Sequence, residues 1–192
     1  MEYSQDNYID QFRQMGKLVD KLSSAYWNDY ASFDTWQFWL NIVFLIGPLI
    51  VLLLFIDRNQ IFRILFFGFT IHALMNYIDA TVVAKGFVFH PYPLIPIIDI
   101  NLSINTSLIP VTFMLFYQYG LNKKKNLYVV GFVAAICTGI ILGTFADSVD
   151  ILRLYRENNV FFVFLVDYIE FILAFWLTCF FDYLTRKKSI LD

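Results

Sequence analysis

Ionisable and amide side chains occur within or directly beside the apolar segments of this 192-residue chain. Such groups are costly in lipid, so they generally mark an ion or proton path or a hydrogen-bonded contact between helices. Carboxyl and imidazole groups can bind protons or cations, and amides can orient them. The candidates are His72, Asn76, Asp79, Asp99, Asn101, Asn105, Asp147, Asp167 and Glu170.

The spacing of these candidates predicts that they converge. His72, Asn76 and Asp79 follow one another at intervals of four and three residues, so they share one face of a helix. Asp167 and Glu170 share a face in the same way. At ~1.5 Å per residue, Asp79 lies ~8 Å inside its span and Glu170 ~15 Å, near the midplane. We therefore expect the carboxyl groups to gather in one half of the membrane.

Two interpretations of this cluster remain open. In the first, the acids line a polar cavity that gathers protons or cations for permeation or sensing. In the second, the polar groups bond one another across helices and only fix the packing of the bundle. A metal site is a weaker alternative, because His72, Asp79, Asp99 and Glu170 show no metal-binding motif, and we predict neither a metal nor a cofactor. Nucleophile, phosphate-binding and zinc-protease motifs are also absent from the sequence, so an enzyme is not indicated.

The composition places these residues in a membrane protein. Apolar residues make up 59% of the chain, aromatic residues 20% and charged residues only 16%, a balance that one soluble core could not hide. The net charge of −2, without a long basic stripe, argues against a nucleic-acid partner. Cys137 and Cys179 lie in apolar segments and are interpreted as small core residues.

The apolar runs predict an all-α protein with five membrane-spanning helices in one domain, residues 36–192. Each run is close to the ~20 residues needed to cross ~30 Å of hydrocarbon. The predicted spans are residues 36–56, 61–84, 94–119, 126–146 and 160–181. The third is unusual, because the stretch from His90 to Gly120 contains four prolines besides Asp99, Asn101 and Asn105. Lipid does not tolerate such a segment unprotected, so other helices should surround it.

Residues 1–35 form a polar arm before the first span. Within the arm, apolar residues recur at three- and four-residue steps, which predicts an amphipathic helix. These residues are Ile9, Phe12, Met15, Val19 and Leu22. The arm could lie on the bilayer, cap the ends of the membrane helices or bind a partner protein.

Basic residues are divided unequally between the two ends of the predicted spans. One end receives eight, namely Arg58, Arg63 and the basic residues 123–125 and 186–188. The other receives Lys85, Arg153 and Arg156, and the three basic residues of the arm lie on the same side but some 15 residues or more from the first span. Since basic residues close to spans are retained in the cytoplasm, we expect an external N-terminus and a cytoplasmic C-terminus.

The fourth span contains small residues at every fourth position: Gly131, Ala135, Gly139 and Gly143. Such a ridge lets another helix approach closely. Either a helix of the same chain or a second copy in a homo-oligomer could occupy it. The lipid bilayer is the first predicted partner, and a membrane partner protein is the other.

A set of short motifs resembles a known family. The motifs are Asp57-Arg58, Tyr92-Pro93, Pro96, Asp99, Pro110, Met114 and Tyr117-Gln118-Tyr119. Together they resemble a family of small uncharacterised multi-pass membrane proteins from spore-forming Firmicutes, over about residues 36–183. The family often carries a Glu-Pro pair where this chain has Ala146, Asp147 and Ser148. The resemblance implies a five-span bundle in a bacterial plasma membrane and no particular activity.

Overall fold

The structure, a computed structural model, describes residues 4–96, 100–155 and 159–188, with side chains up to residue 185. In this part of the chain the fold is all-α, with six continuous helices, which confirms the all-α part of the prediction. One strand pair, β1 (Val88–Phe89) and β2 (Arg153–Leu154), joins two connections in antiparallel register.

The six helices are assembled from the following elements. The α-helical ones are α1 (Gln5–Tyr26), α2 (Trp36–Phe55), α3 (Ile61–Ala84), α4 (Ile109–Asn122), α5 (Leu127–Ala135), α6 (Gly143–Ser148) and α7 (Val160–Lys188). Three π-helical segments continue or precede them: η1 (Trp27–Ala31), η3 (Ile104–Leu108) and η4 (Ile136–Leu142). The short 3₁₀ segment η2 (Arg58–Gln60) leads into α3.

Four of the described helices are long and apolar enough to cross a membrane. They cover Trp36–Phe55, Arg58–Ala84, Leu127–Ser148 and Val160–Thr185, close to four of the five predicted spans. The helix formed by residues 102–122 is not among them. These helices make the chain a candidate multi-pass membrane protein.

The predicted start of the third helix at residue 94 is wrong, because the helix begins at Leu102. Pro91, Pro93 and Pro96 explain the difference, since a residue that precedes proline avoids the α-helical region. Asn101 then starts the helix as its N-cap, with its side-chain oxygen accepting the backbone N–H of Ile104 at 3.1 Å.

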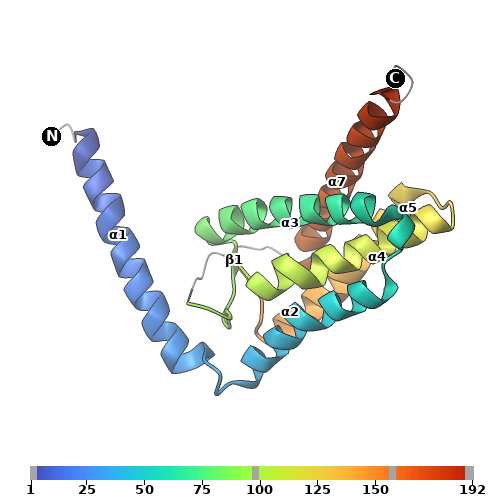
Figure 1. The fold of residues 1–192 in the computed structure, drawn as a ribbon. Coiled ribbons are helices and arrows are strands. Elements are labelled where there is room, and N and C mark those ends of the chain that lie inside the picture. The colour runs from blue at the N-terminus through green and yellow to red at the C-terminus, as the bar shows by residue number, and fades with distance from the viewer. Residues whose placement is uncertain (1–3, 97–99, 156–158, 189–192) are drawn as a thin grey trace.

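The long helices alternate in direction, so the bundle has two ends (Figure 1). We call one the His90 end, where α2 and α7 begin and α3 and α6 finish. The other is the Arg63 end, where Arg63 Nε lies 3.0 Å from the Tyr117 hydroxyl and 2.9 Å from an Asp182 oxygen. Asp167 and Glu170 lie in the first turns of α7, so they belong to the His90 half.

Residues 102–122 lie inside the bundle, between α3 and α5, with α2 against η3. Within α4 only Tyr119 and Asn122 are exposed. The core beside α4 is aromatic: the Phe67 and Tyr117 rings stack at 4.2 Å, and Phe171 meets Phe67 and Phe113 edge-on. The proline-bearing segment is therefore shielded by protein on most sides.

The small-residue ridge of the fourth span packs against α7 of the same chain. A Cβ on Gly131 would lie 2.4 Å from the Phe171 ring, and one on Gly139 would lie 2.4 Å from the Phe164 Cα. Ala135 is fully buried. Gly143 differs, since its nearest neighbour would be 3.7 Å away. Gly131 and Gly139 of the ridge are therefore in contact with a helix of the same chain, which was one of the two partners considered for it.

The arm forms the predicted helix, α1, which extends away from the bundle at its His90 end (Figure 1). Every described residue before Ser23 is exposed, including the apolar stripe with Phe12 71% exposed. The last turn contacts the body, where the Tyr26 ring meets Phe89 edge-on. Val19 and Leu22, at the end of the stripe, line a pocket with Phe89, whereas Ile9, Phe12 and Met15 are more than half exposed.

Candidate functional site

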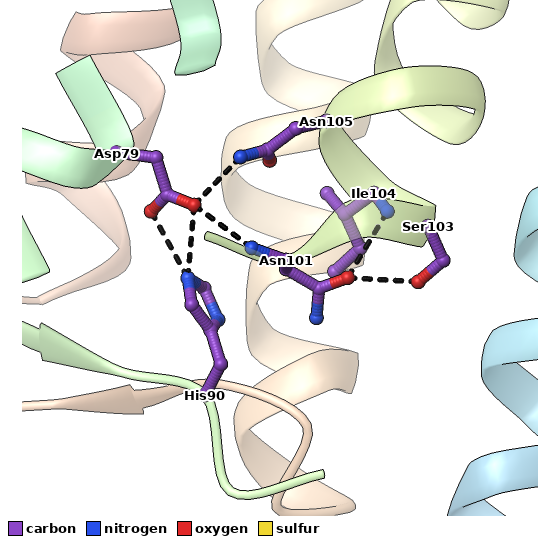
Figure 2. A network of polar contacts seen from close by, with 6 residues as sticks. All are labelled: Asp79, His90, Asn101, Ser103, Ile104 and Asn105. Carbon is purple, nitrogen blue, oxygen red and sulfur yellow. Dashed lines mark hydrogen bonds and ion pairs between the residues drawn. The ribbon is translucent and has the colours of Figure 1, made fainter. Parts of the chain in front are cut away.

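The carboxylate of Asp79 is the centre of a hydrogen-bond network at the His90 end of α3 (Figure 2). His90 Nε2 lies 3.0 and 3.1 Å from its two oxygens, the Asn105 side-chain amide donates at 2.6 Å, and the Asn101 backbone N–H donates at 3.1 Å. An ionised carboxylate can only accept hydrogen bonds, and here every neighbour donates. Hydrogen-bond donors of the protein itself thus satisfy the Asp79 carboxylate.

The proline-rich connection can reach Asp79 because several polar groups fix it to the helices. Ser103 Oγ lies 2.8 Å from Asn101 Oδ1 and also contacts Asn41 Oδ1 on α2. The Asn41 amide in turn donates to the Tyr92 carbonyl at 2.9 Å. Since Asn41, Asn101 and Ser103 are at most 2% exposed, these bonds form in the absence of bulk water.

His72 and Asn76 serve a neighbouring part of the backbone. In η3 the Ile109 N–H bonds the Ile104 carbonyl, so the next donor in this register would be residue 110, a proline without an N–H. The Asn105 carbonyl that is left over accepts from His72 Nδ1 at 2.9 Å. A carbonyl can only accept, so Nδ1 carries the hydrogen. Asn76 donates to the His72 carbonyl at 2.6 Å.

Asp167 and Glu170 project from α7 with far fewer partners. Asp167 is 2% exposed, and one of its oxygens accepts from the Thr138 hydroxyl at 2.5 Å. Glu170 is 1% exposed, and its Oε2 has no hydrogen-bond partner among the described residues. Burying an ionised carboxylate without a donor costs several kcal/mol. A proton, a cation or a water molecule next to Oε2 would remove this cost.

A cavity of about 100 Å³ brings the two groups of acids together. Asp79, His90 and Asn105 line it from one side, and Thr138, Asp167 and Glu170 line it from the other. The remaining wall is apolar, and it includes Met75, Val82, Ile104, Leu142, Val163 and Val166. Two π-helical segments, η3 and η4, contribute to this wall, and such segments often occur at functional sites.

The structure brings together only some of the predicted site residues. Asp79, Asn105, Asp167 and Glu170 line the cavity, and Asn101 joins them through its backbone. Three other candidates are not among the residues that line the cavity. His72 contacts the Asn105 carbonyl, Asn76 bonds the His72 carbonyl, and Asp147 is exposed in the last turn of α6. Asp99 lies outside the described residues.

His90 and Thr138 are the cavity residues that the sequence analysis missed. His90 is only 3% exposed, although it lies in a connection, and it is the imidazole that meets Asp79 in place of His72. Its Nδ1 is buried and has no hydrogen-bond partner within residues 4–96, 100–155 and 159–185. A signal was present, since a histidine within an apolar, proline-rich connection at a span end has little water to solvate it.

The donor set does not form a metal centre. Among residues 4–96, 100–155 and 159–188, no group of three or more histidine, cysteine or acidic side chains is placed to hold a metal ion. The acids are distributed around an apolar space and are not directed to one point. Carboxyl, imidazole and amide groups of this kind can bind protons, form ion pairs and make hydrogen bonds.

Comparison with known proteins returned no matching family profile, no matching curated protein and no matching solved structure. The class is consequently defined by the fold and the site alone. The chain is a candidate multi-pass α-helical membrane protein with an acidic, mostly apolar cavity between α3, α7 and the two π-helical segments.

Proposed function

We propose that this chain is a five-span protein of a bacterial plasma membrane that binds protons or small cations at Asp79, Asp167 and Glu170 for permeation or sensing. The location follows from the resemblance to the Firmicutes family. One observation carries the functional proposal: Glu170 presents a buried oxygen without a partner to a cavity that is shared with two other carboxyl groups.

The fifth span of the proposal is the helix of residues 102–122. Its 21 residues would extend ~30 Å, the thickness of the hydrocarbon layer. Its polar residues make this helix less apolar than the four candidate spans. However, α2, α3 and α5 pack around it, and a helix that is shielded from lipid needs no apolar surface of its own. In this topology the Arg63 end is cytoplasmic, and the cavity is near the outer face.

In this proposal Asp79 and Glu170 have different roles. Asp79 and His90 are nearer the end of α3, where they can exchange a proton with water that enters the cavity. Glu170 binds the ion ~15 Å from the start of α7. Beyond Glu170, the fully buried rings of Phe67, Phe113 and Phe171 close the route toward the Arg63 end. Permeation would require these rings to move, whereas sensing would not.

Flux through reconstituted vesicles tests the proposal. Purified protein in vesicles that contain a pH-sensitive dye should dissipate a proton gradient or a monovalent-cation gradient, and Glu170→Gln should abolish the change. Asp147→Asn is the matched control, because it removes an exposed carboxyl group of the same half and should leave flux unchanged.

A sensing role predicts a different result. The protein would move no ion, but a pH step should change the fluorescence of a probe attached near η4, and Glu170→Gln should remove that response. If neither flux nor a Glu170-dependent conformational response is found, the proposed function is wrong.

A second candidate function is a membrane scaffold or accessory subunit, and the exposed stripe of α1 favours it. Ile9, Phe12 and Met15 are 54–71% exposed and pack on nothing in the described chain. A cysteine at Phe12 should then crosslink a partner protein in native membranes, whereas a lipid-bound helix would yield only lipid adducts.

A further inference from the structure

We infer that the cavity beside Glu170 binds a small primary alkylammonium ion, with the ammonium group on Glu170 and the alkyl chain against the apolar wall. This inference rests on the proposed function, because it names the class of cation that the same site would take. It commits to an organic cation and excludes a hydrated metal ion.

The unpaired oxygen of Glu170 identifies where the charge would be held. Asp79 already accepts from His90, Asn101 and Asn105, and one oxygen of Asp167 is taken by Thr138. Glu170 Oε2 has no donor in the part of the chain that the structure describes, although the side chain is 1% exposed and lines the cavity. An ammonium group carries three N–H donors on a compact charge, so it can satisfy Glu170 and still reach a second acceptor.

The rest of the wall selects against a divalent metal ion and suits a cation that carries an apolar group. A divalent metal ion requires about six oxygen ligands or retained water. The wall instead offers Met75, Val82, Leu142, Val163 and Val166 beside its few polar atoms. Alkyl groups gain free energy when they leave water for such a surface. A ligand with one cationic end and one apolar end therefore matches both parts of the cavity.

The size of the cavity limits the length of the ligand. Its volume of about 100 Å³ is somewhat smaller than the ~150 Å³ apolar cavity that admits benzene in an engineered protein. A chain of about three carbon atoms with its nitrogen fits this space. n-Propylammonium is accordingly the probe, and n-hexylammonium should be excluded.

Calorimetric titration of the full-length protein in detergent micelles tests this inference, with empty micelles as the blank. We expect saturable binding of n-propylammonium and none of n-propanol, which has the same shape without the charge. Glu170→Gln should weaken binding by at least about tenfold, the loss expected for one charge-assisted contact. Asp147→Asn should leave the affinity unchanged. Equal binding of n-propanol, or equal affinity in Glu170→Gln, would overturn the inference.

A second variant tests the apolar part while leaving every carboxyl group in place. Gly143 lines the cavity, and a Cβ there would meet no atom closer than 3.7 Å, so Gly143→Ala should fold and add one methyl group at the wall. It should weaken n-propylammonium binding and spare methylammonium. If both ions lose affinity equally, the alkyl chain is not held by this wall.

The calorimetric and flux outcomes are separable. Proton flux without n-propylammonium binding would eliminate the alkylammonium inference and keep the proposed function. Glu170-dependent binding without flux or a conformational response would keep the site and eliminate the proposed function.

Discussion

Asp79 and Glu170 face one cavity from two helices, yet their surroundings are opposite. Asp79 accepts from an imidazole, a side-chain amide and a backbone N–H, whereas Glu170 Oε2 accepts from nothing in the described chain. The partners of Asp79 come from the proline-rich connection that folds back onto α3. The connection therefore satisfies the Asp79 carboxylate as part of the fold, and it supplies no described donor to Glu170 Oε2.

The largest effect is expected from Asp79→Asn. The amide keeps the size of the carboxylate but places a donor among three donors, and it leaves His90 without its acid. Removing one partner from a buried, hydrogen-bonded pair costs about 3–5 kcal/mol. Reversible unfolding in mixed micelles should show this loss of stability. A cost below about 1 kcal/mol, the range of an exposed pair, would mean that Asp79 does not organise the connection.

The same chemical change at Glu170 should have little effect on stability. Glu170→Gln loses no hydrogen bond from Oε2, and Glu170→Met should stabilise the fold by about 1–4 kcal/mol, as apolar replacements of buried charges often do. The assay is the unfolding experiment used for Asp79→Asn. A destabilisation as large as that of Asp79→Asn would remove the contrast between the two acids.

Sequence periodicity located both acids but not their partners. The three- and four-residue intervals placed Asp79 on one face of α3 and Asp167 with Glu170 on one face of α7, because helical spacing alone decides which residues share a face. It could not reveal His90, whose contact with Asp79 depends on how an irregular connection folds. That connection also shortened the predicted third helix, since prolines act on local backbone geometry and not on hydropathy.

The sequence pattern also could not predict the π-helical segments or the exposure of Asp147. Pro110 indicates that the helix around it is irregular. The contact between His72 and the Asn105 carbonyl, however, could be predicted only by knowing that α3 lies beside η3. Asp147 continues the spacing of the small-residue ridge and is nevertheless exposed, because α6 ends one residue later. Spacing gives the face of a residue and does not give the length of the helix that presents it.

Gly139→Ala tests how closely α7, the helix that carries Glu170, packs against η4. A Cβ at this position would lie 2.4 Å from the Phe164 Cα, which is backbone and cannot rotate away, so α7 must shift. We expect a loss of about 1–3 kcal/mol in the free energy of unfolding. Gly143→Ala is the control, and it should be neutral or stabilising by up to about 1 kcal/mol, because alanine favours a helix where space exists. Equal losses in the two variants would show that α7 is not held at Gly139.

The smallest effect concerns Asp57, a carboxyl group outside the spans that, like Asp79, is held by donors from its own chain. The backbone N–H of Asn59 donates to Asp57 at 3.0 Å, and this bond is the main reason that the pKa of Asp57 lies below its ordinary value. A carboxyl group whose pKa is lowered on folding stabilises the protein above its unfolded pKa of about 3.9, and that contribution is lost as the pH falls through the folded pKa.

The stability difference between the native chain and Asp57→Asn should therefore be present at about pH 7 and should shrink as the pH falls below about 4. Thermal unfolding at a series of pH values measures it, and the difference between the two proteins cancels the titration of the other acids. The effect should be small, because Asp57 is partly exposed and water already solvates much of its charge. A difference that stays constant across this range would mean that the ionised form of Asp57 adds nothing. Hydrogen-bond donors from the protein would then stabilise a carboxylate only where water is excluded, as at Asp79.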